Sequence, residues 1–324
     1  MRHWFATILL LAPLGLTAQV PSVAAKPAGA ATVKSWMPSR TIDGQPDLQG
    51  TWTNASNVPL ERPAGLGAKE FYTPEEVSAK AKAGFQGERP VTVEAHYDLS
   101  QFGLDPSQGK FAPNLRTSLL IGPEGRIPPQ TPEARARVAA NAAKAKGHEF
   151  DAAENRPLSE RCILWLNQGP PMLQSGYNSN LQIFEGAGYV AILQEMIHDV
   201  RMIPIDGRPH LPANIRQWRG DSRGHWEGNT LVVDTTNFTS RTAFRGSTES
   251  LHVIERFTRT SEDVILYEFT VEDPATWTKP WTVQMPLGKA PGRIFEYACH
   301  EGNYGMANTL SEARALEAEK KAGK

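Results

Sequence analysis

Short apolar runs and alternating apolar and polar residues recur at regular spacing from residue 181 onward. Alternation places successive side chains on opposite faces of a strand, so these segments predict strands. The strands are expected at 189–193, 200–205, 225–226, 231–234, 251–258, 264–271, 281–285 and 294–299. Gly228-Asn229 is typical of a tight hairpin, because glycine adopts the positive φ that such turns require. Consecutive strands predict a mainly β protein, an antiparallel meander that forms a barrel-like or strongly bent sheet.

A few peripheral helices are expected outside this sheet. Thr73 offers an N-cap hydroxyl and Glu76 completes a capping box, which predicts a helix from 73 to about 83. An alanine-rich segment at 131–147 begins with Thr-Pro-Glu and ends at a glycine. It has little apolar area to bury, so we expect it on the surface. A last helix is expected at 309–324, where a threonine is again followed three residues later by glutamate.

The N-terminus has the features of a cleavable export signal. A short basic start precedes an apolar stretch at 6–18, and Ser22-Val23-Ala24 has the small residues that a signal peptidase recognises. A signal peptide is therefore expected at 1–24, with the mature chain beginning near Ala25 in the periplasm or outside the cell. The apolar stretch is short for an uncleaved transmembrane anchor, which needs about 20 apolar residues.

The rest of the chain divides by composition. An extended lead-in rich in alanine, proline and lysine is expected at 25–49. An irregular, partly helical region at 50–160 is expected to pack on the barrel. The β-meander domain is expected at 161–308, before the helix at 309–324. Formal net charge is −1, so we expect no binding to nucleic acid. The oligomeric state is left open.

The sequence contains two cysteines, Cys162 and Cys299. An exported protein with an even number of cysteines usually pairs them, so a disulfide is expected. The alternative is a thiolate nucleophile or metal ligand, because Cys299 is followed by His300 and Glu301.

Three stretches carry a resemblance to a group of exported bacterial proteins with no assigned activity. They are Pro46-Asp47-Leu48-Gln49-Gly50-Thr51-Trp52, Trp226-Glu227-Gly228-Asn229-Thr230-Leu231-Val232-Val233-Asp234-Thr235 and Cys299-His300-Glu301-Gly302-Asn303-Tyr304. This resemblance covers most of the mature chain and implies no reaction. Separately, Gly50-Thr51-Trp52 is similar to the Gly-x-Trp opening of lipocalin-like (calycin) barrels, which supports the fold class alone.

Acidic residues and a histidine recur on the predicted C-terminal strands. Alternation puts Glu255 and Glu268 on strand faces that neighbouring strands could bring together with Glu296 and His300. A carboxylate beside a histidine can orient or activate a base, so such a cluster suits proton transfer. The alternative is that these glutamates face water or pair with arginines across strands.

A second concentration of polar residues lies between Glu195 and Glu227. Its candidate ligand-binding residues are His198, Arg201, His210, Asp221 and Arg223. Loops on a rigid sheet commonly carry binding sites, and arginines hold anions through paired N–H donors. Ordinary salt bridging is the alternative for each arginine. Aromatic residues that could line a pocket are Trp165, Tyr177, Tyr189, Trp218, Trp226, Trp277, Trp281 and Tyr304; ordinary core packing is their alternative.

Metal and nucleotide cofactors are not expected. Glu195 and His198 would share a face of a helix, but on a strand this spacing separates them. No His-x-x-x-His or paired Cys-x-x-Cys motif is present, and no glycine-rich phosphate loop or Gly-x-Ser-x-Gly elbow occurs.

These patterns lead to the hypothesis of an exported barrel that binds a small organic molecule. It would act by metal-free acid–base chemistry as a lyase, isomerase or hydrolase. His300 would be the base, Glu301 its orienting carboxylate and Glu255 a second acid, with Arg201 and Arg223 as anion clamps. His198 is a further catalytic candidate, and Asp221, His210, Glu268, Trp226 and Tyr304 are substrate-binding candidates. The alternatives are a non-catalytic module for carbohydrate or an envelope partner, and a metal-dependent hydrolase.

Overall fold

The computed structural model describes residues 36–56, 58–79, 114–174, 178–242, 244–290 and 292–323. The expected signal peptide at 1–24 lies outside the described residues, as does the end of the helix expected at 73–83. Residues 74–79 are helical, and the predicted capping box is present. Glu76 N donates to Thr73 Oγ1 at 3.2 Å, and Thr73 N donates to Glu76 Oε2 at 2.8 Å.

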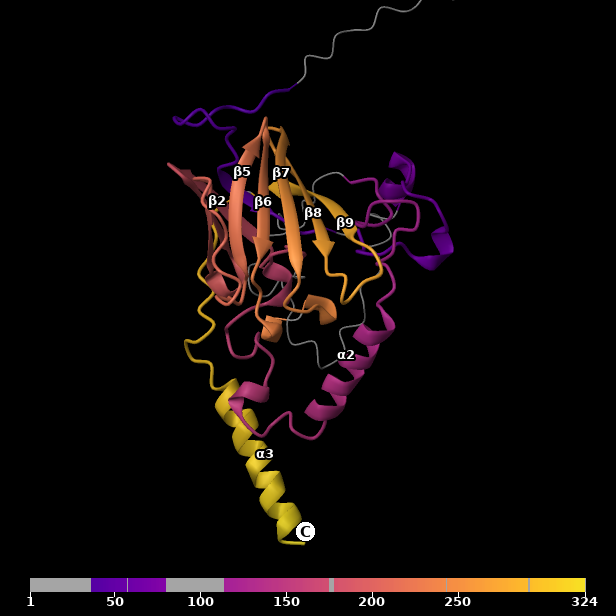
Figure 1. Cartoon of the computed structure of the whole chain (residues 1–324), viewed down its shortest axis with the longest axis vertical. Coiled ribbons are helices and arrows are strands. Elements are labelled where there is room, and N and C mark those ends of the chain that lie inside the picture. The colour runs from indigo at the N-terminus through magenta and orange to yellow at the C-terminus, as the bar shows by residue number, and fades with distance from the viewer. Residues whose placement is uncertain are drawn as a thin grey trace, which may run out of the picture. The chain divides into compact units, whose positions relative to one another are not determined.

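Nine antiparallel strands form one sheet that is nearly closed into a barrel (Figure 1). They are β1 (Gly50–Thr53), β2 (Asn180–Gly186), β3 (Tyr189–Gln194), β4 (Val200–Pro204), β5 (Asp221–Glu227), β6 (Thr230–Thr236), β7 (His252–Ser261), β8 (Val264–Glu272) and β9 (Trp281–Lys289). Their order is β4-β3-β2-β1-β9-β8-β7-β6-β5. The predicted mainly β meander is confirmed. Two consecutive meanders are joined by β1, which pairs with β2 on one side and β9 on the other.

A glycine lets the two ends of the sheet approach each other. A Cβ atom at Gly224 of β5 would lie 3.0 Å from Cγ2 of Ile203 in β4 and 2.8 Å from Cγ2 of Ile205, just after β4. Real Cβ contacts are essentially never so short, so a larger residue would push the β4 and β5 edges apart. At this point the barrel therefore closes by packing the side chains of Ile203 and Ile205 against the backbone of Gly224.

Side chains fill the barrel interior. The alternation on β7 is as predicted, because Val253, Glu255 and Phe257 are all fully buried. The core also includes Trp52, Leu181, Ile183, Val190, Ile192, Ile203, Leu231, Val233, Tyr267, Phe269, Val271, Trp281, Val283, Met285 and Leu287. Leu48 and Met172 add to it from outside the strands.

The strand expected at 294–299 is wrong. Residues 293–298 have no regular secondary structure. Both edges of β9 are already paired, to β8 and to β1, so the segment after β9 meets no free edge there. The edge of β9 next to which this strand would have paired is occupied by β1, a strand that apolar periodicity does not predict. The irregular region expected from residue 50 therefore contributes a strand to the sheet.

Two longer helices also lie outside the sheet. Helix α2 (Pro132–Ala145) begins as predicted, with Thr131 Oγ1 accepting from Ala134 N at 3.0 Å, and is mostly exposed. Helix α3 (Gly305–Lys321) begins before the expected residue 309. Cys162 and Cys299 form the predicted disulfide, with their Cα atoms 5.8 Å apart, so their use as free thiolates is wrong. Among the described residues, no helix is long and apolar enough to cross a membrane.

Candidate functional site

The segment after the barrel carries several expected site residues, and it holds them in solvent. His300 and Glu301 are exposed, and Tyr304 is 74% exposed at the start of α3. Glu296 is exposed as well, whereas Glu255 is fully buried. The predicted cluster of His300 with these carboxylates is therefore wrong, because it required a strand at 294–299.

Glu268 also lies away from Glu255. The residue opposite Glu255 in the β7–β8 register is Phe269, so Glu268 points to the outer face of the sheet. There it lies opposite Arg256 and accepts from Gln284 Nε2 at 3.2 Å. The surroundings of Glu268 therefore fit the alternative of cross-strand pairing better than a catalytic role.

Inside the barrel, Arg201 and Glu255 form the centre of a buried polar network. Arg201 Nη1 donates to Glu255 Oε1 at 3.0 Å, and its Nη2 contacts the other carboxylate oxygen. Arg201 Nε donates to Ser222 Oγ at 3.0 Å, and Nη2 donates to Thr235 Oγ1 at 2.9 Å. The side chains of Arg201 and Glu255 are 5% and 0% exposed. This inner network uses Arg201 as an internal partner of Glu255 and leaves it no freedom to clamp a substrate.

Tyr267 completes the inner network. Its hydroxyl donates to Glu255 Oε1 at 2.7 Å and accepts from Met172 N at 2.9 Å. Burial raises the pKa of Tyr267 well above its usual range, and the Glu255 charge raises it further. Tyr267 therefore stays protonated. Every group in the inner network has a partner, which is the condition under which buried polar groups stabilise a fold.

A second polar network lies on the outer face of β5 to β8. His210 bridges two carboxylates: its Nδ1 lies 3.0 Å from Asp221 Oδ2 and its Nε2 lies 2.8 Å from Asp234 Oδ1. His252 repeats the arrangement, with Nε2 2.7 Å from Asp234 Oδ2 and Nδ1 3.2 Å from Glu272 Oε2. Two imidazoles therefore approach opposite oxygens of Asp234. We call these five residues the outer cluster.

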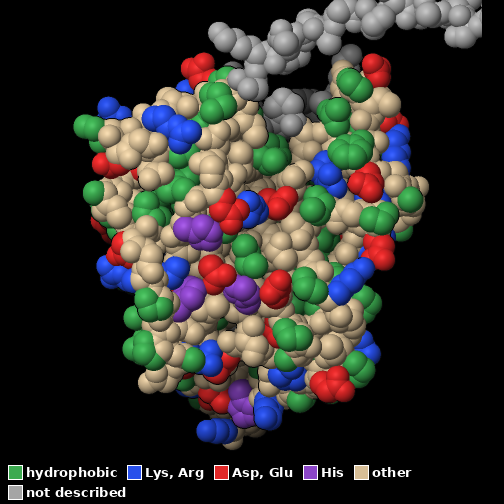
Figure 2. Space-filling view, turned by 45° about the horizontal axis from the view of Figure 1, so that its top comes forward, with side chains coloured by type: hydrophobic (Ala, Val, Ile, Leu, Met, Phe, Trp, Pro, Cys, Tyr) green, Lys and Arg blue, Asp and Glu red, His purple; other side chains and the backbone are tan. Residues whose placement is uncertain are grey.

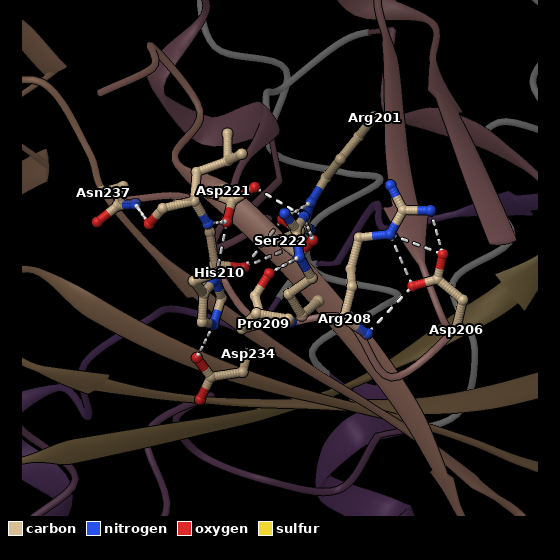
Figure 3. Close-up of polar contacts among 12 residues, drawn as sticks. Arg201, Asp206, Arg208, Pro209, His210, Asp221, Ser222, Asp234 and Asn237 are labelled. Carbon is tan, nitrogen blue, oxygen red and sulfur yellow. Dashed lines mark hydrogen bonds and ion pairs between the residues drawn. The ribbon is translucent and has the colours of Figure 1, made fainter. Parts of the chain in front are cut away.

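The β4–β5 connection brings His210 to this face. Figure 3 shows His210 between Asp221 and Asp234, with Arg201 and Ser222 nearby. Leu211 N donates to Asp221 Oδ2 at 2.8 Å, and Asn237 Nδ2 donates to Leu211 O at 2.8 Å.

Arg223 strengthens the same end of the cluster. Its Nε donates to Pro209 O at 3.0 Å, and its Nη1 forms an ion pair with Asp221 Oδ1 at 2.7 Å. The backbone and side chains of the connection are thus tied to β5 and β6 around His210.

Hydrogen-bond chemistry determines the protonation of the two rings. An ionised carboxylate only accepts hydrogen bonds, and a neutral imidazole has one donor. Each ring lies between two carboxylates, so both rings make two hydrogen bonds only as imidazolium. The pKa of His252 is raised, first by its hydrogen bond to Asp234, although burial opposes this. Burial raises the pKa of Asp234, but His252 and His210 together outweigh it and the net pKa is lowered.

The outer cluster is accessible from solvent. The side chains of His210, His252, Asp234 and Glu272 are 28%, 30%, 36% and 40% exposed, whereas Asp221 is 5% exposed. Figure 2 shows histidine side chains gathered with carboxylates on this face of the protein. A small molecule can reach these side chains without a change in the barrel.

Sequence reasoning found two of the five residues of this cluster, His210 and Asp221, and the neighbouring Arg223. It placed His210, Asp221 and Arg223 in one candidate ligand-binding region, and the structure brings these three together. It gave no role to Asp234 or Glu272. The Gly228-Asn229 turn fixes the hairpin register, which places Asp234 opposite Arg223. The position of Asp234 next to the β5 candidates could therefore have been predicted from the sequence. The place of His210 over β6 was not.

Two further candidates lie outside the outer cluster. His198 is exposed in the turn before β4. Trp226 is half-buried and packs against the core. The aromatic candidates do not share a pocket: Trp277 and Trp281 are in the core, Tyr189 is 42% exposed, and Tyr177 lies outside the described residues. Core packing therefore accounts for the two tryptophans.

In the part of the chain that the structure describes, no group of three or more His, Cys, Asp or Glu side chains is arranged to hold a metal ion. Comparison of the sequence and the fold with protein-family models, with curated proteins and with solved structures found no match. The geometry of the outer cluster is thus the basis for a functional proposal.

Proposed function

We propose that the protein is exported, binds a small organic molecule on the outer cluster and acts on it by acid–base chemistry without a metal. The observation that carries this is the pair of imidazoles on opposite oxygens of Asp234, each with a second carboxylate behind it. Export rests on the N-terminal signal pattern, and an extracellular or periplasmic location fits the Cys162–Cys299 disulfide.

Each histidine and the carboxylate at its Nδ1 form a dyad. Asp221 holds His210, and Glu272 holds His252, so the Nε2–H of each ring is oriented toward Asp234. A substrate that displaces Asp234 from one ring receives that proton on a carbonyl or leaving-group oxygen, while the Nδ1 contact stabilises the ring. Asp234, freed from this contact, accepts a proton from the substrate or from water. Elimination, isomerisation and hydrolysis all use this pair of transfers.

A non-catalytic binding role is the second candidate. A hollow of about 440 Å³ lies beside the disulfide and is lined by Glu160, Tyr297, Asn303 and Met306 among others. This hollow has a volume suited to a small ligand, and it lies apart from the side chains of the outer cluster. Binding there without turnover would support this role.

Turnover can be tested without a known substrate. The purified protein is incubated with a panel of small organic acids, esters and sugars in deuterium oxide, and mass spectrometry detects deuterium uptake or new products. The proposal expects a positive compound in the panel, with the rate lost in His252→Asn and His210→Asn. His225→Asn is the matched control, because His225 lies on the same face of β5 and contacts Glu227 at 3.2 Å.

Equal rates in His252→Asn and in the unmodified protein would overturn the proposal. A rate that disappears on chelation and returns with added metal would favour a metal-dependent hydrolase instead. Ring-nitrogen NMR provides a readout that needs no substrate. The pKa of His252 is raised, chiefly by its hydrogen bond to Asp234, and His210→Asn is expected to shift the titration of His252 through the shared Asp234.

A further inference from the structure

Arg219, just before β5, has a buried guanidinium that the outer cluster does not use. Its side chain is 12% exposed. Its three nitrogens have almost no contact with solvent and make no hydrogen bond to any residue that the structure describes. A guanidinium offers five N–H donors, and buried donors without acceptors are strongly unfavourable. An acceptor for this group is therefore expected.

Asp199 is the carboxylate that approaches Arg219. Its Oδ2 lies 3.2 Å from Arg219 Nη1, close enough for an ion pair but without the alignment of a hydrogen bond. Asp199 is 46% exposed, and its Oδ1 already accepts from Val200 N at 2.8 Å. Asp199 thus neutralises part of the guanidinium charge but accepts no hydrogen bond from the N–H groups of Arg219.

Arg201 and Arg219 differ in their counter-charges. Arg201 and Glu255 neutralise each other in the inner network. Arg219 has no buried carboxylate of its own. Burial lowers the pKa of Arg219, and the Arg201 charge lowers it further, while Asp199 and Glu255 raise it. The carboxylate in ion-pair contact with the buried Arg219 guanidinium is thus the half-exposed Asp199.

The turn that presents Asp199 is strained. Ile197 and His198 adopt φ angles of 62° and 56°, in the left-handed region that favours glycine. Ile197 is β-branched, for which this conformation is a genuine outlier. Such strain persists only where surrounding structure holds it and often marks positions that change conformation. Movement of this turn would withdraw Asp199 from Arg219 and relieve the strain.

We propose that Arg219 is the receptor for the carboxylate of a small organic anion, and that Asp199 occupies the position of this carboxylate in the unliganded protein. The anion pairs with Arg219 through two parallel N–H···O bonds, as carboxylates do with arginine. Because Asp199 Oδ2 lies 3.2 Å from Arg219 Nη1, the ligand enters by displacing Asp199. This site shares no side chain with the outer cluster, so either proposal can fail alone.

The test titrates the full-length mature protein with sodium acetate and sodium benzoate, using sodium chloride to keep ionic strength constant. Tryptophan fluorescence is one readout, because Trp218 adjoins Arg219. The other is the thermal unfolding temperature, which rises with occupancy of any ligand that binds only the folded state. We expect a saturable response to the carboxylates and none to chloride.

Three variants make the test specific. Asp199→Asn removes the internal competitor and is expected to tighten acetate binding by about tenfold. Arg219→Gln is expected to abolish the saturable response. Arg208→Gln is the control, because Arg208 is an exposed arginine that pairs with Asp206.

The proposal is overturned if Arg219→Gln responds like the unmodified protein, or if Asp199→Asn binds no more tightly. Absence of a saturable response in every form also overturns it. Should Arg219→Gln fail to fold, the direction of change in Asp199→Asn decides alone.

Discussion

The inner and outer networks lie on opposite faces of the same strands and differ in how their charges are satisfied. In the inner network, Arg201 carries a permanent charge and Glu255 is fully buried. In the outer cluster, the hydrogen-bond partners of the carboxylates are the imidazoles of His210 and His252, and most of the carboxylates are partly exposed. Arginine keeps its proton at every pH that the fold experiences, whereas histidine exchanges its proton near neutrality. The inner network is therefore fixed, and the outer cluster responds to pH and to ligands.

The largest effect is expected from breaking the inner network on one side. Arg201→Met leaves Glu255 buried without its cation, which costs about 3–5 kcal/mol of unfolding free energy. Chemical denaturation measures the loss. The double variant Arg201→Met/Glu255→Leu removes both charges and is expected to recover most of it. If Arg201→Met lowered the unfolding free energy by less than about 1 kcal/mol, the pair would not be structural.

Glu185 lies on β2 and belongs to neither network. It tests how burial shifts the pKa of a carboxylate. The net pKa of Glu185 is raised to about 7, chiefly by burial and also by the Asp47 charge, against the opposing effects of Leu48 N and Arg259. Because this folded-state pKa lies above the unfolded value, the associated stability is complete below about pH 4.5 and is lost as pH rises through 7.

Glu185→Gln should therefore raise the unfolding free energy at pH 8. Partial exposure limits the gain to about 1–2 kcal/mol. At pH 4 the unmodified protein and the variant should be equally stable. Chemical denaturation of both proteins at pH 4 and pH 8 measures how the stability difference between them changes with pH. Equal stability at pH 8 would contradict the raised pKa.

The outer cluster should show the same pH sign with a smaller amplitude. The pKa of His252 is raised, so its stabilising contacts are complete below its unfolded value and are lost as pH rises through the folded pKa. His252→Asn is expected to cost about 1 kcal/mol at pH 5.5, after allowance for exposure, and nothing at pH 9. A cost that does not change with pH would indicate that packing, and not charge, is what His252 contributes.

The smallest effect is expected at the exposed cross-strand contacts. Arg256 Nη2 donates to Glu227 Oε2 at 2.7 Å, and the two side chains are 39% and 50% exposed. Arg256→Gln should change the unfolding free energy by less than about 0.5 kcal/mol, because exposed ion pairs contribute little. A larger loss in the thermal unfolding temperature would show that the whole outer face acts as one electrostatic network.

The difference between correct and incorrect expectations follows from the range of each interaction. The β5–β6 hairpin, the inward side chains of β7, the capping box at Thr73 and the N-cap at Thr131 depend on neighbours within a few residues. All of them are present in the structure. The strand expected at 294–299 depended on a free edge beside β9. Residues 50–53 pair with that edge, and no local pattern reveals this.

The candidate site divides in the same way. The sequence by itself determined which residues can carry charge and which strand face each occupies, because alternation and turn chemistry are local properties. Only the tertiary structure decided that Arg201 reaches across to Glu255 and that His210 lies over Asp234 from a connection outside the sheet. It also decided that His300 stays in solvent. Barrel closure sets these outcomes, because it brings β4 beside β5 and so determines which side chains lose water and which charges must find partners.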